Sequence, residues 1–92
     1  MKWTVGITDK AAKTISRLPE SVRSRLVALM LDIEARGPVR GNWPNYGRLG
    51  VNLHHCHIKI GRPTYVAIWE SVDNAARLVE VKYVGTHEKA PY

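Results

Sequence analysis

The sequence predicts an α+β fold of two layers: one strand, a helical hairpin and a three-stranded antiparallel meander, forming one four-stranded sheet. Its 92 residues, of which 45% are hydrophobic, suffice for a single domain over residues 1–92 with one core. Between residues 8 and 36 the apolar residues recur at helical spacing. Before and after that region they alternate, as they do along a strand. These observations place two helices between the first strand and the others.

The first strand and both helices precede the middle of the chain. Residues 2–7 alternate as a short strand. Thr8 suits the N-cap of a first helix, which runs to about Leu18. A second helix is expected over residues 20–36, ended by Gly37. Its apolar stripe consists of Val22, Leu26, Leu29, Met30 and Ile33.

The remaining strands follow a loop over residues 39–50 that is rich in Gly, Asn and Pro. They are expected at residues 51–59, 64–70 and 77–84, joined by segments short enough for hairpins. An antiparallel helix pair returns the chain to the end where it began, so the strand at residues 51–59 should run antiparallel to the first strand. Two helices cover one face of this sheet, which leaves the other face open for binding.

Positive charge is concentrated in the middle of the chain. The net charge is +6, and no Asp or Glu lies between Glu34 and Glu70. The same window holds three of the four histidines and five other basic residues, which are Arg36, Arg40, Arg48, Lys59 and Arg62. This distribution predicts a positive surface that RNA, DNA or an acidic peptide can bind.

Cellular location is suggested by what the sequence lacks. No apolar run approaches the roughly 18–20 residues of a membrane span, and the N-terminus shows no signal peptide. The single cysteine, Cys56, cannot form an internal disulfide. These features predict a cytoplasmic protein that does not bind membranes.

Alternation along the strand at residues 51–59 assigns its side chains to two faces. Cys56 and Ile58 are the more apolar, so we place them toward the helices, together with His54. The open face then receives His55, His57 and Lys59.

The next two strands are assigned in the same way, although a slip of one residue would exchange the faces. At residues 64–70 we expect the inward side chains to be Val66 and Ile68. The outward ones are then Tyr65, Ala67 and Trp69. At residues 77–84 we expect the inward side chains to be Val79, Val81 and Tyr83. The outward ones are then Glu80 and Lys82. Tyr65 and Trp69 can bind a ligand there or simply cover the sheet.

The histidines allow several interpretations. His55 and His57 can form a mere surface pair, or they can chelate zinc with His87 or Cys56 as a third ligand. Cys56 points to the opposite face, however, and no carboxylate lies nearby in sequence. The same geometry argues against a cysteine nucleophile with a histidine base. We therefore expect no metal and no other cofactor.

RNA cleavage by attack of the 2′-hydroxyl suits these residue types better. The reaction needs a base for the 2′-hydroxyl and an acid for the leaving 5′-oxygen, and histidine fills both roles near neutral pH. Lysine and arginine neutralise the phosphate, and aromatic rings stack a splayed base. On this interpretation the expected RNA-binding residues are Arg40, Arg48, Tyr65, Trp69, Lys82 and Lys89.

Three segments carry a resemblance to a known family. "RLPESVRSRL" resembles the helical hairpin of the RelE/ParE toxin superfamily, "HCHIKIGRPTYVAIWE" its central hairpin, and "VEVKYVGTHEKAPY" its last strand and tail. The order of elements over the whole chain also matches, closest to the RelE and HigB side. The resemblance implies the toxin of a type II toxin–antitoxin pair, an mRNA endonuclease that acts on the ribosome and inhibits translation. It also implies a cognate antitoxin that wraps the toxin and blocks its site.

Matching the family's motifs residue by residue gives an expected catalytic set. The basic residues of the second strand correspond to His55, His57 and Lys59. Arg62, in the following turn, is the nearest match to an arginine near the third strand. His87 and Tyr92 match the basic or histidine residue and the tyrosine near the C-terminus. His87 is thereby predicted as general acid or base, with Tyr92 orienting or stacking the substrate.

Two other functions fit the same fold. One is a ParE-like inhibitor that binds DNA gyrase and cuts nothing, and the other is a non-catalytic module that binds RNA or protein. For the antitoxin, the charge pattern predicts an acidic or amphipathic segment that covers the basic region over residues 36–62.

Overall fold

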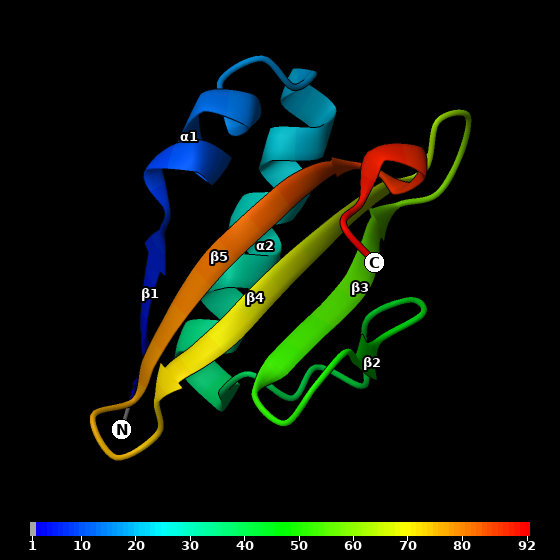
Figure 1. Cartoon of the computed structure of the whole chain (residues 1–92). Coiled ribbons are helices and arrows are strands. Elements are labelled where there is room, and N and C mark those ends of the chain that lie inside the picture. The colour runs from blue at the N-terminus through cyan, green and yellow to red at the C-terminus, as the bar shows by residue number, and fades with distance from the viewer. Residues whose placement is uncertain (1) are drawn as a thin grey trace.

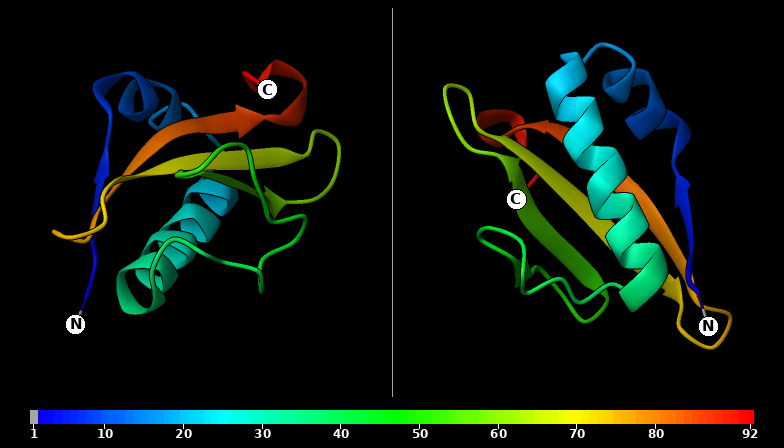
Figure 2. Two further views of the ribbon diagram at one scale, coloured as in Figure 1. Left: turned by 60° about the horizontal axis from the view of Figure 1, so that its bottom comes forward. Right: turned by 180° about the vertical axis from the view of Figure 1, so that it is seen from behind.

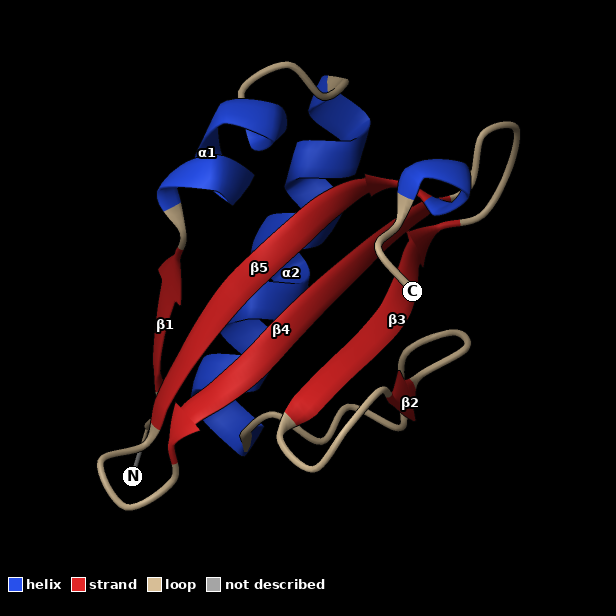
Figure 3. Cartoon of the chain, in the orientation of Figure 1, coloured by secondary structure: helices blue, strands red, loops and turns tan. Residues whose placement is uncertain are grey.

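The computed structural model describes residues 2–92, which form two helices and a five-stranded sheet (Figures 1 and 3). The elements follow in the order β1 (Thr4–Ile7), α1 (Asp9–Ile15), α2 (Glu20–Arg36), β2 (Gly47–Arg48), β3 (Leu53–Lys59), β4 (Tyr65–Asp73), β5 (Leu78–Thr86) and the short 3-10 helix η1 (His87–Lys89). Seen from behind, α2 crosses one face of the sheet (Figure 2). The C-terminal segment lies on the opposite face (Figure 2). The helices and the single sheet confirm the predicted α+β class with two layers.

The helix boundaries follow the sequence signals. The Thr8 hydroxyl accepts a hydrogen bond from the Ala11 amide at 3.1 Å, which caps α1 as predicted. α1 ends at Ile15, three residues before the expected Leu18. α2 ends at Arg36 and is capped by Gly37, whose φ of 95° favours glycine. Its buried side chains come from the predicted stripe and are Val22, Leu26, Leu29 and Ile33.

The sheet differs from the prediction in two respects. Its strand order is β1-β5-β4-β3-β2, so the two-residue strand β2 adds a fifth member beside β3. β1 pairs in parallel with β5, and the β3–β4 and β4–β5 pairs are antiparallel, so β1 and β3 run in the same direction. The expected antiparallel orientation was therefore wrong. The reason is helix length: α1 advances about 10 Å and α2 about 25 Å, so the pair carries the chain back past its starting end.

The inner face of β3 is as predicted, but that of β4 is reversed. Cys56 and Ile58 are fully buried in the core beneath α2. Because Cys56 lies opposite Ala67, both face the helices, and so does Trp69 two residues on. Four successive residues of β4, Val66 to Trp69, are buried. Because all four are apolar, the pattern of hydrophobicity could not indicate which side chains face the helices. The open face is apolar here because the C-terminal segment covers it.

β5 keeps Val79 and Val81 in the core, as predicted. A register shift opposite Ile68 and Trp69 then moves Val84 into the core. The inward position expected for Tyr83 was therefore wrong, and its side chain lines a hollow on the open face. No helix within residues 2–92 is long and apolar enough to cross a membrane.

Candidate functional site

Four aromatic side chains meet on the open face where the C-terminus returns to β3. The rings of His57 and His87 are 5.3 Å apart between centroids and stand edge to face. Tyr92 lies 4.9 Å from the ring of His55 and 5.9 Å from that of His87. Thus β3 supplies two histidines, and the segment after β5 supplies a histidine and a tyrosine (Figure 1).

Backbone contacts hold the C-terminal segment in this position. The amide of His87 donates to the carbonyl of Thr64 at 2.8 Å, which fastens the start of η1 to the start of β4. The amide of Ala90 donates to the carbonyl of His87 at 3.2 Å and closes the single turn. The chain can then place Tyr92 beside His55.

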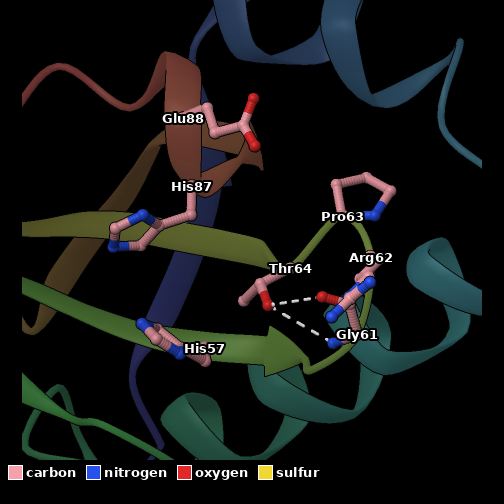
Figure 4. Close-up of a pocket in the computed structure, with 7 residues that line it drawn as sticks. All are labelled: His57, Gly61, Arg62, Pro63, Thr64, His87 and Glu88. Atoms are coloured by element: carbon pink, nitrogen blue, oxygen red, sulfur yellow. Dashed lines mark hydrogen bonds between the residues drawn. The ribbon is translucent and has the colours of Figure 1, made fainter.

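A hollow opens beside the pair of His57 and His87. Its lining residues are His57, Gly61, Arg62, Pro63, Thr64, His87 and Glu88. Figure 4 shows the two imidazole rings next to each other, with the turn that carries Arg62 at the other side of the hollow and the Glu88 carboxylate directed away from the rings. The Thr64 hydroxyl bonds with both the amide and the carbonyl of Gly61, which fixes that turn. The hollow therefore presents two imidazoles and one guanidinium.

The environment favours the neutral forms of the imidazoles of β3. Burial lowers the pKa of His57, and the neighbouring His87 lowers it further. Burial also lowers the pKa of His55, with smaller contributions from His57 and His87. Burial raises the pKa of Tyr92, so its phenol keeps its proton at neutral pH. A neutral imidazole can accept a proton from a hydroxyl group, which is the chemistry of a general base.

His55 is enclosed more tightly than His57. A Cβ at Gly47 would lie only 3.1 Å from His55 Nε2, so the absence of a side chain there lets β2 approach the ring. The other ring nitrogen, Nδ1, is buried and has no hydrogen-bond partner in the described chain. His55 packs against the ring of Tyr92 and does not line the hollow, whereas His57 does.

No protein-family model matches the sequence. No curated protein matches it either. Solved structures do match. The E. coli toxin RelE with two arginines replaced by alanine, in its free state, superposes with a TM-score of 0.75 and 19% identity over 98% of this chain and 88% of that chain.

Two toxin–antitoxin complexes match as well. The archaeal RelE–RelB complex from Pyrococcus horikoshii OT3 gives a TM-score of 0.72 and 16% identity over 98% of this chain and 100% of that chain. The intact E. coli RelBE complex gives a TM-score of 0.66 and 18% identity over 95% of this chain and 99% of that chain. This protein has the RelE fold. The fold expected from the three sequence segments is thereby confirmed.

Several residues expected at the site of this RelE fold lie elsewhere. A register shift between His57 and Lys59 turns the lysine from the open face, and its ammonium donates to the Ser21 hydroxyl of α2 at 2.8 Å. Trp69 is fully buried, and its indole donates to the Pro38 carbonyl at 2.9 Å. Tyr65 packs against the core. The outward positions predicted for Tyr65, Ala67 and Trp69 were wrong.

Two of the predicted RNA-binding cations are engaged by carboxylates. Arg40 is buried and bonds Asp32 at 3.0 Å. Lys82 is on the open face as predicted, but it contacts Glu80 at 2.9 Å and Glu70 at 3.3 Å. The remaining two, Arg48 and Lys89, are exposed. The pairings of Arg40 with Asp32 and of Lys82 with Glu70 depend on tertiary contacts, whereas Glu80 and Lys82 are neighbours on one face of β5, as the sequence predicted.

The surroundings of Cys56 argue against the alternative of a cysteine nucleophile. Cys56 is fully buried, and burial raises its thiol pKa to about 12, so the reactive thiolate does not form near neutral pH. Within residues 2–92 no group of three or more His, Cys, Asp or Glu side chains is arranged to hold a metal ion.

Sequence reasoning missed two residues that border the site. Glu88 follows His87 directly and lines the hollow, so its position was available from the sequence. Arg25 of α2 donates to the carbonyl of Ile58, next to His57. Arg25 precedes Ile58 by 33 residues, and no local pattern in the sequence connects the two.

Proposed function

We propose that this protein is the toxin of a toxin–antitoxin pair and cleaves mRNA on the ribosome, without a metal ion, in the cytoplasm. The observation that carries the proposal is the pair of His57 and His87, whose rings lie 5.3 Å apart beside a hollow that also holds Arg62. Two proton-transferring groups and a cation beside one hollow are what cleavage by a 2′-hydroxyl requires.

The roles follow from the surroundings of each group. His57, with its lowered pKa, takes the proton from the 2′-hydroxyl. The 2′-oxygen then bonds to phosphorus, the bond from phosphorus to the 5′-oxygen breaks, and His87 gives a proton to that leaving oxygen. Arg62 neutralises the charge that develops on the phosphate. Tyr92 stacks on the substrate or orients it from beside His87.

The RelE fold supports the choice of substrate and partner. Solved structures of this fold include RelE bound to RelB in an archaeal and in an E. coli complex. We infer that the present chain also has a cognate antitoxin. A net charge of +6 favours an acidic or amphipathic antitoxin segment and a polyanionic substrate.

Expression in bacteria followed by mapping of mRNA 5′-ends tests this function. The proposal expects new ends within codons of translated messages, and their loss in the His87→Ala variant. An SOS response with intact mRNA would instead indicate a gyrase inhibitor. Intact mRNA without an SOS response would leave a binding module on the same fold.

A further inference from the structure

A second hollow begins at His57 and passes over the edge of β3 toward α2. We call it the edge groove, and its lining residues are Arg25, Pro44, His57, Ile58, Lys59 and Ile60. It shares His57 with the hollow beside His87. The shared histidine places the edge groove next to the hollow beside His87, on the side toward the helical layer.

The edge groove holds two cations that form no ion pair with a carboxylate of residues 2–92. Nε of Arg25 donates to the Ile58 carbonyl, which anchors the guanidinium and leaves its terminal amino groups without a partner in the described chain. Nζ of Lys59 donates to the Ser21 hydroxyl at 2.8 Å, a neutral partner. Arg40 and Lys82, in contrast, are paired with acids. None of the residues that line the edge groove is acidic.

The walls of the groove are fixed by the fold. The amide of His57 donates to the Pro44 carbonyl at 2.8 Å, which holds the loop over residues 39–46 against β3. Ile60 is 65% exposed and offers apolar surface at the rim. Two anchored cations beside an apolar side chain can grip a phosphate and contact its ribose.

We propose that Arg25 and Lys59 bind a phosphate that flanks the scissile one, so that the RNA strand passes over the edge of β3. This inference rests on the proposed function, because it extends the substrate from the site at His57. Because His57 lines both hollows, one RNA strand that reacts at His57 also borders the edge groove. This favours RNA over an acidic peptide as the occupant.

The test measures binding of a fluorescein-labelled 2′-O-methyl RNA of twelve nucleotides, which cannot be cleaved by 2′-hydroxyl attack. The full chain is titrated at several KCl concentrations, and the slope of log K against log salt gives the number of phosphates neutralised. Arg25→Gln and Lys59→Gln should each weaken binding about tenfold at low salt. Each should also reduce the slope, by at most the value of about 0.7 that one neutralised phosphate contributes.

The matched control is Arg36→Gln. Arg36 lies on the same helix, about 16 Å from Arg25 along the axis, and its side chain is 67% exposed. This variant should leave affinity and slope at the parent's values. Arg25→Lys keeps the charge and should keep the slope. Should Arg25→Gln fail to fold, which its thermal melt reports, Lys59→Gln decides the question.

The outcomes separate the two proposals. Slopes of the groove variants equal to that of Arg36→Gln would overturn the edge groove, and so would a parent chain that does not bind this RNA at low salt. Unchanged RNA binding with lost binding of a co-purified antitoxin would assign the groove to an acidic peptide and also overturn it. Mapping of mRNA ends in cells decides the endonuclease function independently of these results.

Discussion

His57 and His87 show how much of the site depends on single residues. They lie 30 positions apart, as their numbers show, and they meet because the amide of His87 is bonded to the Thr64 carbonyl. Neither imidazole is held by a carboxylate among the contacts of the described chain. Burial, and to a smaller extent the neighbouring His87, lowers the pKa of His57.

Replacing His87 by alanine should lower mRNA cleavage by about 10²-fold or more, because general acid–base catalysis contributes that much. Folding should be unaffected, since the side chain is exposed in η1. Single-turnover cleavage of ribosome-bound mRNA measures the effect, with Lys13→Ala in α1 as an exposed control. A His87→Ala variant that cleaves at close to the parent's rate would move the proton chemistry to His55 or His57.

The pH dependence of cleavage should report on His57. Its folded-state pKa is lowered below the ordinary value of 6.5, so the imidazole stays neutral and active as a base down to a pH below 6.5. The acidic limb of kcat/KM should accordingly have its midpoint below pH 6.5, and His57→Ala should abolish that limb. A limb centred above pH 6.5 would contradict His57 as the base.

Among the elements, the loop between α2 and β2 is held to the helical layer by one carboxylate. One carboxylate oxygen of Asp32 accepts hydrogen bonds at 3.0 Å each from Arg40, Asn42 and Trp43. Beyond this hub, Tyr46 bonds His54 at 2.7 Å. The loop then places the Pro44 carbonyl against His57, so Asp32 helps to shape the site from the helical layer.

Asp32→Asn should destabilise the protein by about 1–2 kcal/mol at pH 7, allowing for solvent screening. The hydrogen bond from Asn42 is the main cause that lowers the Asp32 pKa from 3.8 to about 2. A lowered pKa stabilises the fold above about pH 4, and this contribution is lost as the pH falls through about 2. Urea denaturation should show the difference in free energy of unfolding between the parent and Asp32→Asn at pH 7. This difference should disappear near pH 2. Glu34→Gln on the same helix is the control. A stability difference between the parent and Asp32→Asn that does not change with pH would contradict the role of the Asp32 carboxylate.

The sequence predicted elements better than their arrangement. Helical spacing, Thr8 and Gly37 were sufficient to place α1 and α2. The direction of β1 depended on the unequal helix lengths, and the faces of β4 were hidden by its run of buried residues. The direction of the Lys59 side chain depends on one register shift, and Arg25 reaches β3 only in the folded chain.

At the scale of the whole molecule, the core and the candidate site lie on opposite faces of the sheet. α2 covers one face and packs on the core, and the C-terminal segment lies on the other face together with the histidines (Figure 2). The site therefore exists only when the end of the chain has returned to its middle. A polyanion can then reach the histidines without displacing any part of the core.

The ends of the cleavage products test the central claim most directly. We would incubate the purified chain with ribosome-bound mRNA in excess EDTA, after supplying the ribosomes with a stabilising polyamine, and analyse the new termini by mass spectrometry. Attack by the 2′-hydroxyl with His57 and His87 as the proton carriers predicts a 2′,3′-cyclic phosphate on one fragment and a 5′-hydroxyl on the other, undiminished by the chelator. Termini that carry a 5′-phosphate, or cleavage that stops with the chelator and returns with added metal, would contradict the account.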